Sequence, residues 1–275
     1  MSYAKTILYL KMAEETLYTP NTGMVTISTA NSNRDGTGTL GSVITGADNG
    51  TIIKSVIIKA QTNTTQGSIR FFIDTGVGNA KLITEIRIPA ITKSARNKSF
   101  ETIIALDLVL QSGQILKAST QNAETFNIIA IGLDTSYSTT SLQDSTQFAI
   151  QGNVDRISVA NPNLNGTGTL VDIIVPSGGS EYVGATIQRF FIKALATTTP
   201  GMIRLYLRDS AGTLTLLFTE IPVPAITPTA TALSFSAIVK YNDFYLPLNY
   251  RILASTEKAE TFVITAEALK IAYIK

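Results

Sequence analysis

The chain has 275 residues, of which 44% are hydrophobic and 15% charged, and its formal net charge is +2. It contains no cysteine, histidine or tryptophan, so it lacks disulfides, the most common general base near neutral pH, and the usual ligands of soft-metal sites. The small net charge gives no basic footprint for nucleic acid, and no run of about 18 apolar residues predicts a membrane-spanning helix.

The N-terminal segment, residues 1–23, has no counterpart later in the chain, and we predict that it forms an arm. Its apolar run Ile7–Leu10 is shorter than a signal-peptide core and is followed at once by Lys11, so we expect no export signal. Residues 4–15 are the one segment whose pattern is also compatible with a helix.

Residues 24–137 carry short runs rich in Val, Ile, Phe and Thr, in which apolar and polar residues alternate. Gly, Asn or Asp separates one run from the next. This pattern predicts strands. Eight strands are expected, at 25–29, 38–45, 52–60, 68–74, 81–88, 100–110, 115–119 and 126–133. The pairs Asp35-Gly36 and Asn165-Gly166, and Gly113, supply residues that tolerate the positive φ of tight turns.

The same series of motifs occurs twice, which defines the architectural unit. NSNRDGTGTL at 31–40 returns as NPNLNGTGTL at 161–170, and Ala-Ser-Thr at 118–120 returns at 254–256. The offset grows only from 130 residues (31 to 161) to 136 residues (118 to 254), so the copies differ by small insertions, which belong in loops.

The stretch 138–153 is rich in Ser, Thr and Gln and is predicted to be a linker, with the second copy at 154–275. Strands are expected again in the second copy, among them 187–194, 203–207 and 263–269. Eight strands in each copy predict an all-β chain of two tandem, homologous, antiparallel β-sandwich domains. Eight strands suit a jelly roll better than the seven of an immunoglobulin-type domain.

Two repeated features resemble functional motifs. Gly-Thr-Gly-Thr-Leu at 36–40 and 166–170 lacks the lysine and the following helix of a phosphate-binding loop, so we interpret it as a glycine-bent strand entry. The repeated charges occupy strand positions, where we expect paired surface or edge charges rather than catalytic groups. These charges are Lys59/Lys193, Arg70/Arg204, Glu85/Glu220 and Glu124/Glu260. No catalytic residue, cofactor or metal site is assigned.

The copies diverge in two places that are candidate sites. The first copy has a basic loop with Lys93, Arg96 and Lys98, which would suit an acidic partner or be simply solvated. The second copy has an aromatic segment, which has two interpretations. Its side chains pack in the core or at a protein interface, or they stack on a ligand. Its candidate residues are Tyr241, Asp243, Phe244, Tyr245 and Tyr250.

The order of the repeated motifs resembles small jelly-roll proteins encoded among the head and tail genes of tailed bacteriophages. It runs from GTGTL through a Lys-Ala strand, Gly-x-Ile-Arg, Glu-Ile-x-x-Pro-Ala and finally Ala-Ser-Thr-x-x-Ala-Glu-x-Phe, in both copies. The resemblance implies a virion component without enzymatic activity, such as a capsid decoration, head-fibre or tail protein, assembled in the host cytoplasm.

The predicted partners are therefore other virion proteins and further copies of the chain, as a homo-oligomer for which a trimer is one arrangement. Neither nucleic acid nor a membrane is expected as a partner. The alternative function is a carbohydrate-binding or receptor-binding adhesin module that uses the segment 241–250.

Overall fold

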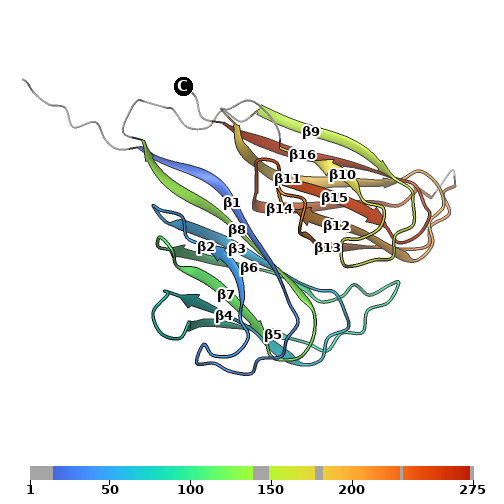
Figure 1. The fold of residues 1–275 in the computed structure, drawn as a ribbon. Helices are drawn as coiled ribbons and strands as arrows, with labels where there is room; N and C mark the ends of the chain where they lie inside the picture. Colours follow the sequence, from blue (N-terminus) through green and yellow to red (C-terminus); the bar gives the residue numbers. More distant parts are fainter. Residues whose placement is uncertain (1–14, 139–148, 177–181, 230–231, 273–275) are drawn as a thin grey trace, which may run out of the picture.

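The computed structural model describes residues 15–138, 149–176, 182–229 and 232–272, and within these ranges it is built entirely from strands and loops (Figure 1). The first half contains β1 (Glu15–Ile27), β2 (Gly41–Thr45), β3 (Thr51–Ala60), β4 (Gly67–Asp74), β5 (Lys81–Ile88), β6 (Glu101–Leu110), β7 (Ile115–Thr120) and β8 (Phe126–Ser138). The second half contains β9 (Ala149–Ile157), β10 (Val171–Ile174), β11 (Tyr182–Ala194), β12 (Gly201–Arg208), β13 (Thr215–Val223), β14 (Ser236–Pro247), β15 (Arg251–Thr256) and β16 (Phe262–Ala272). The eight strands predicted for the first copy are all confirmed. No helix long and apolar enough to cross a membrane occurs among these described ranges.

Each half forms two four-stranded antiparallel sheets with the same strand order. In the first half the orders are β1-β8-β3-β6 and β2-β7-β4-β5, and in the second they are β9-β16-β11-β14 and β10-β15-β12-β13. With strands counted from one within each half, both read 1-8-3-6 and 2-7-4-5. Two four-stranded sheets in this order are a jelly-roll arrangement, so the all-β sandwich prediction is confirmed. We call β1–β8 the first sandwich and β9–β16 the second sandwich.

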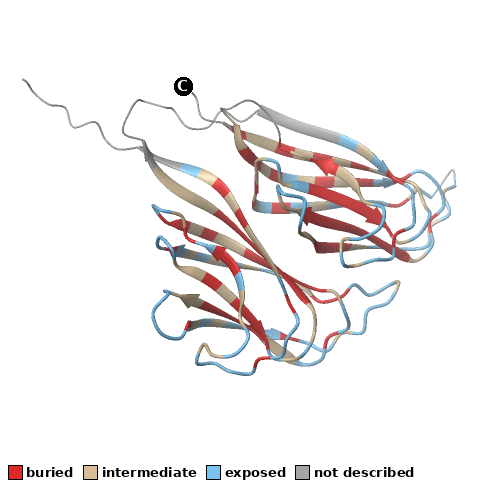
Figure 2. Ribbon diagram, in the orientation of Figure 1, coloured by how far each residue is buried: buried red, intermediate tan, exposed pale blue. Residues whose placement is uncertain are grey.

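Both sandwiches bury the residues that alternate along their strands (Figure 2). Ile53, Val56 and Ile58 of β3 pack with Phe71 of β4 and Ile128 of β8 between the sheets of the first sandwich. Removing this apolar surface from water stabilises each sandwich, because buried surface contributes about 25 cal/mol per Å². Core packing therefore explains the regular alternation seen in the sequence.

Two predicted boundaries differ from the structure. Residues 15–23, predicted to belong to an arm, form the first part of β1, which pairs with β8 from Glu15 to Ile27. β1 lies at the edge of its sheet, and proline is found on edge strands because they pair on one side only. Residues 149–153, predicted to belong to the linker, form the start of β9, which pairs with β16. Residues 1–14 and 139–148 of the predicted arm and linker lie outside the described residues.

The two sandwiches are in contact. The edge strands β13 and β14 of the second sandwich pack against β1, β3 and β8 of the first, on the outer face of the sheet β1-β8-β3-β6. Figure 1 shows β13 and β14 on the side of the second sandwich that faces the first. We call this contact the docking contact.

Candidate functional site

The GTGTL repeat is a structural loop. The Asn31 side chain donates from Nδ2 to the carbonyls of Thr37 and Thr39 at 2.9 and 3.0 Å, and Asn161 repeats both bonds to Thr167 and Thr169 at 2.9 Å. Gly38, with φ of 80°, lies so close to Asn31 that an added Cβ would be 2.8 Å from its amide group. A buried asparagine thus organises the loop, and the glycine leaves room for it, as expected for a glycine-bent strand entry.

The repeated arginines link this loop to the sheet. Arg70 donates from Nη1 to the Asn31 carbonyl at 3.0 Å and from Nε to Glu85 at 2.7 Å. In the second sandwich Arg204 donates to the Asn161 carbonyl at 3.2 Å and to Glu220 at 3.1 Å. Both arginines are buried, so these repeated charges are not the surface charges that the sequence suggested.

The repeated glutamates Glu124 and Glu260 accept hydrogen bonds from a neighbouring loop. Glu124 accepts from the backbone N–H of Thr65 at 2.7 Å, and Glu260 accepts from that of Thr199 at the same distance. The repeated polar motifs therefore hold loops to one another and to strands in both sandwiches. Among the described residues, no group of three or more Asp or Glu is placed to hold a metal ion.

A buried ionic network forms the polar part of the docking contact. Lys59 of β3 is fully buried, and its ammonium lies 3.0 Å from Glu220 and 3.3 Å from Glu101. Glu220 is also paired with Arg204 at 3.1 Å, and it accepts from the backbone N–H of Ser99 at 3.2 Å. One lysine from the first sandwich thus bridges a carboxylate from each sandwich.

The ionisation of Glu220 depends on this network. Burial by itself would raise the pKa of Glu220, but the ammonium of Lys59 and the guanidinium of Arg204 outweigh it and lower the pKa to about 2. The carboxylate is therefore charged across the neutral range, and its partners come from both sandwiches.

Hydrogen bonds from uncharged donors extend the network along β13. The Thr219 hydroxyl donates to Glu101 at 2.8 Å, and the backbone N–H of Glu220 donates to the same carboxylate at 3.2 Å. The Asn127 amide donates to the Leu217 carbonyl at 2.9 Å. Side chains of the first sandwich thereby satisfy backbone groups of an edge strand that would otherwise be available for pairing.

The apolar part of the docking contact continues the core of the second sandwich. Ile57 of β3 and Ile129 and Ile131 of β8 belong to the same buried cluster as Phe218 and Phe244 of the second sandwich. The aromatic rings are closely packed, with 5.5 Å between the centroids of Phe218 and Phe244. The sheet face of the first sandwich therefore closes the open side of the second.

The aromatic residues singled out in the sequence lie at or near this contact. Tyr241 and Phe244 are buried, with ring centroids 5.2 Å apart, and Tyr250 donates its hydroxyl to the Thr22 carbonyl at 3.2 Å. Burial, and the Glu101 carboxylate, raise the pKa of Tyr241 well above its usual value. Tyr245 is partly buried, and the Asp243 side chain lies outside the described part of the structure. Their role as a surface for another molecule stays a prediction.

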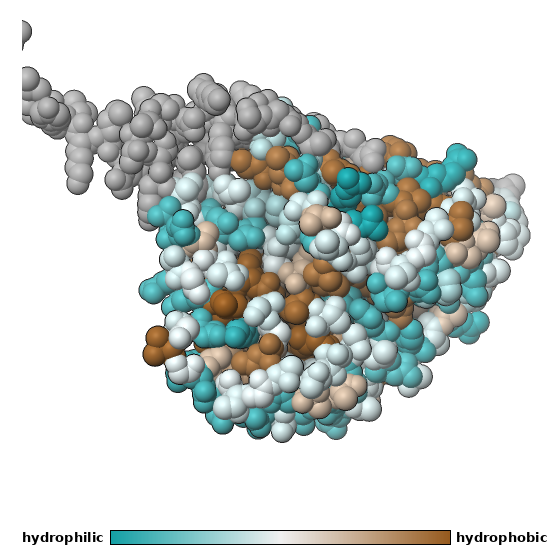
Figure 3. Space-filling model, viewed as in Figure 1, coloured by the Kyte–Doolittle hydropathy of each residue, from teal (hydrophilic) through white to brown (hydrophobic). Residues whose placement is uncertain are grey.

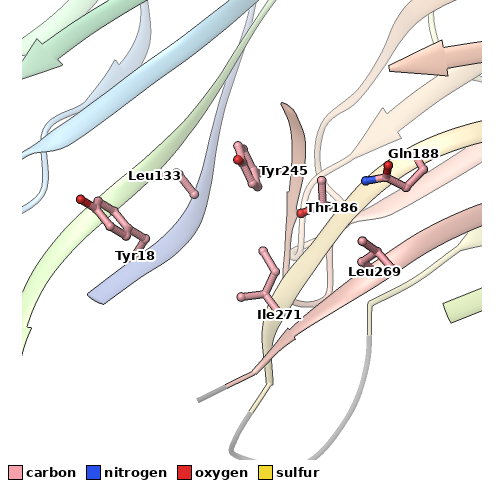
Figure 4. A pocket seen from close by; sticks show the side chains of 7 residues that line it. All are labelled: Tyr18, Leu133, Thr186, Gln188, Tyr245, Leu269 and Ile271. Carbon is pink, nitrogen blue, oxygen red and sulfur yellow. The ribbon is translucent and has the colours of Figure 1, made fainter. Parts of the chain in front are cut away.

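Tyr245 contributes to a cavity of about 290 Å³ between the sandwiches. Figure 4 shows Tyr18 and Leu133 of the first sandwich on one side of it and the side chains of the second sandwich on the other. The lining residues are Tyr18, Leu133, Thr186, Gln188, Tyr245, Leu269 and Ile271. The cavity is mainly apolar, with a few polar groups that could orient a ligand.

A second recess, of about 300 Å³, lies on the second sandwich and is polar. Arg189 and Glu267 line it and form an ion pair at 2.6 Å, and the Arg189 guanidinium also stacks over Phe191 at 4.8 Å from the ring centroid. Arg189 and Glu267 balance each other, and the exposed Lys240, which also lines the recess, adds one positive charge.

The predicted basic loop is exposed but not concentrated into one site. The backbone N–H of Lys93 donates to Asn63 at 3.0 Å and that of Arg96 to Ser94 at 3.2 Å, while the Lys98 ammonium lies 3.4 Å from Glu101. Lys98 thus reaches the margin of the docking contact. Binding of an acidic partner by this loop stays a prediction.

Sequence reasoning identified Lys59 and Glu220 as repeated charges but not as a pair. They are 161 positions apart, and their copies Lys193 and Glu85 look the same in the sequence. The one sequence signal that points to these two residues is the repeat, because it shows which charged positions both sandwiches retain.

No protein-family model matches this sequence, and no curated protein matches it. Among solved structures, the chain is similar to the STIV MCP, a virus capsid protein, at 11% identity and a TM-score of 0.26, with 95% of this chain and 96% of that chain covered. It is also similar to the CBM22-1-CBM22-2 tandem domain of Paenibacillus barcinonensis Xyn10C, at 10% identity and a TM-score of 0.25, with coverages of 94% and 93%.

A third similar structure is PNGase F, a glycosylasparaginase from Flavobacterium meningosepticum, at 10% identity and a TM-score of 0.24, with coverages of 90% and 96%. These proteins include a capsid protein, carbohydrate-binding modules and an enzyme. Such low identities and TM-scores do not select one of these classes, so the function has to be argued from the residues of this chain.

Proposed function

We propose that this chain is a non-enzymatic structural protein of a tailed-phage virion, a capsid or tail component that docks through its β-sandwich surfaces. The observation that carries the proposal is the docking contact, in which the edge of one sandwich packs on the sheet face of another around Lys59 and Glu220. The most elaborate arrangement of charged groups in the described residues serves to hold one sandwich on another.

The repeated polar residues support the same role. Asn31, Arg70 and Glu124, and their copies in the second sandwich, are engaged in bonds that shape loops and join them to strands. A rigid sandwich with well-held loops suits a part that makes repeated contacts in an assembly. The proposed partners are other virion proteins and further copies of the chain, assembled in the host cytoplasm, with no nucleic acid or membrane contacted.

The test is whether the chain is part of a particle. Particles from a host that carries the gene are banded on a density gradient, and the band is analysed by mass spectrometry and by electron microscopy with an antibody against the chain. We expect the chain in the particle band and the label at regular positions on the particle. A host in which the gene is interrupted provides the control. A chain that remains in the soluble fraction and never labels particles would contradict the proposal.

A carbohydrate-binding or receptor-binding adhesin is the second candidate, and the cavity lined by Tyr18 and Tyr245 favours it. Aromatic rings beside amide and hydroxyl groups are typical of sites that stack on sugars. A glycan array probed with the purified chain tests it, with Tyr245→Ala as the variant. Val159→Ala, at an exposed residue that does not line the cavity, is the control. Binding that Tyr245→Ala removes and Val159→Ala retains would favour the adhesin.

A further inference from the structure

The docking contact joins two surfaces, and the chain carries a second example of each. The first surface is the edge formed by β13 and β14, and its equivalent in the first sandwich is the edge formed by β5 and β6. The second is the outer face of the sheet β1-β8-β3-β6, and its equivalent is the outer face of β9-β16-β11-β14. We call these equivalents the free edge and the free face, since nothing among the described residues closes them in the way the docking contact does.

The free edge repeats the residues that dock in the second sandwich. Strand pairing places Thr84 opposite Phe71 and Thr219 opposite Leu205, so β5 and β13 correspond residue by residue. Leu217, Phe218, Thr219 and Glu220 in β13 therefore correspond to Leu82, Ile83, Thr84 and Glu85 in β5. Three of the four residue types are identical, and the fourth is apolar in both strands.

The two edges differ in what covers them. Phe218 is 1% exposed and Ile83 is 37% exposed, and the side chain of Glu220 is 3% exposed against 34% for Glu85. The neighbouring β6 presents Leu106 and Leu108 only partly buried. The first sandwich thus exposes the apolar and acidic groups that the second sandwich buries in the docking contact.

The free face also repeats its docked equivalent. In the first sandwich, one row of cross-strand neighbours consists of Met24, Ile129, Ile57 and Ile103, and two of these, Ile57 and Ile129, are buried in the docking contact. The matching row in the second sandwich is Val154, Thr265, Phe191 and Ile238. Val154 is 63% exposed and Ile238 is 57% exposed.

The cation of the docking contact is present on the free face as well. The Lys59 ammonium donates to the Ser99 carbonyl at 3.3 Å, and the Lys193 ammonium donates to the Ser234 carbonyl at 2.9 Å. Lys59 is fully buried beside Glu220, whereas Lys193 is exposed. Strand register puts Lys193 in the row next to Phe191 and Ile238, as Lys59 lies in the row next to Ile57.

We infer that a second copy of this chain occupies the free edge, with its own free face packed on β5 and β6 and its Lys193 beside Glu85. The occupant is a second copy because the matching edge and face lie on one chain, and the face of the first sandwich is already covered within the chain. The contact is heterologous, so repeated copies close into a ring or continue as a filament. This inference deepens the proposed assembly role by naming the self-association surfaces.

The contact between chains is expected to be weaker than the docking contact within the chain. In the row on the other side of Phe191, the free face carries Arg189 and Glu267 where the first sandwich has Ser55 and Ile131. Arg34 already pairs with Glu85 at 3.1 Å, so Lys193 would be the third cation near this carboxylate, after Arg34 and Arg70. Association is therefore expected to depend on protein concentration and to decrease with salt.

Two variants that each damage one surface test the inference. Ile83→Glu places a charge on the free edge and leaves the face intact, and Ile238→Glu does the reverse. Both positions are exposed, and Val77→Glu, at an exposed residue on neither surface, is the matched control. Sedimentation velocity is measured over a concentration series for the full chain, each variant and a 1:1 mixture, and circular dichroism verifies that each variant is folded.

We expect the full chain and Val77→Glu to form species larger than a dimer, and each interface variant to be a monomer of 29.5 kDa. In the mixture, the intact edge of Ile238→Glu should bind the intact face of Ile83→Glu. The resulting dimer should grow no further, because the edge and the face that it leaves open are the two damaged ones. Lys193→Glu is a second face variant and should behave like Ile238→Glu. A full chain that stays monomeric, interface variants that assemble normally, or a mixture that stays monomeric would each overturn the inference. A monomeric chain that is still found in particles would leave the virion role standing.

Discussion

Replacing Lys59 by methionine tests whether the buried network holds the two sandwiches together. Methionine keeps most of the side-chain volume but removes the ammonium that lies 3.0 Å from Glu220 and 3.3 Å from Glu101. Two carboxylates at the docking contact then share fewer cations, and one of them, Glu220, is almost fully buried.

The size of the effect follows from what remains around the carboxylates. Breaking a buried ion pair by removing one partner costs about 3–5 kcal/mol, since the remaining charge is left buried. Glu220 retains Arg204 at 3.1 Å, and Glu101 retains Lys98 at 3.4 Å near the surface. We therefore expect a loss at the lower end of the range, about 3 kcal/mol of the free energy of unfolding.

The chain contains its own control. Lys193 stands in the same Ile-Lys-Ala context as Lys59 but is exposed, so Lys193→Met should change the free energy of unfolding by less than about 0.5 kcal/mol. Urea unfolding at neutral pH, followed by far-ultraviolet circular dichroism because tryptophan is absent, measures both variants. Equal midpoints for Lys59→Met and Lys193→Met would refute the argument that the buried network stabilises the docking contact.

Three further predictions concern the pH dependence and the loops. The folded pKa of Glu220, about 2, lies below its ordinary value of 4.5, so its stabilisation is complete above pH 4.5 and is lost as the pH falls towards 2. Urea midpoints between pH 2 and 6 should show a loss on the order of 3 kcal/mol from this group, and Glu220→Gln should lack this component. Asn31→Ala removes two bonds from a buried side chain to backbone carbonyls of the loop and should lower the free energy of unfolding by about 2–3 kcal/mol, whereas the exposed Asn33→Ala should lower it by less than about 1 kcal/mol in thermal melts. The double variant Lys93→Ser with Arg96→Ser should leave the melting midpoint almost unchanged, since both side chains are exposed, and a clear loss would show that the loop contributes to stability.

The apolar residues on the surface in Figure 3 separate what the local sequence pattern predicts from what packing decides. Brown patches of apolar residues lie among teal hydrophilic residues and white residues of intermediate hydropathy on the visible side of the molecule. Exposed apolar residues such as Ile83, Ile103 and Val109 alternate with inward residues along β5 and β6. Alternation therefore predicted that these segments are strands, although it did not predict which side of each strand a neighbouring sandwich covers.

Local signals were sufficient for the strands and turns because they depend on neighbours in the sequence. The predicted strand 81–88 coincides with β5, and Gly36, Gly113 and Gly166 adopt the positive φ values expected of their turns. The beginning of β1 was missed, because residues 15–23 become a strand only by pairing with β8, more than 100 positions away. Pairing over such distances is decided by the tertiary fold.

The sequence by itself determined the duplication, the strand content and the residues that both sandwiches retain. The tertiary structure alone decided what those residues do. Ile58-Lys59-Ala60 and Ile192-Lys193-Ala194 have the same sequence and the same strand position, yet one lysine is fully buried beside Glu220 and the other is exposed. The physical reason is that burial of a charge depends on the surface packed against it, and here that surface comes from the other sandwich.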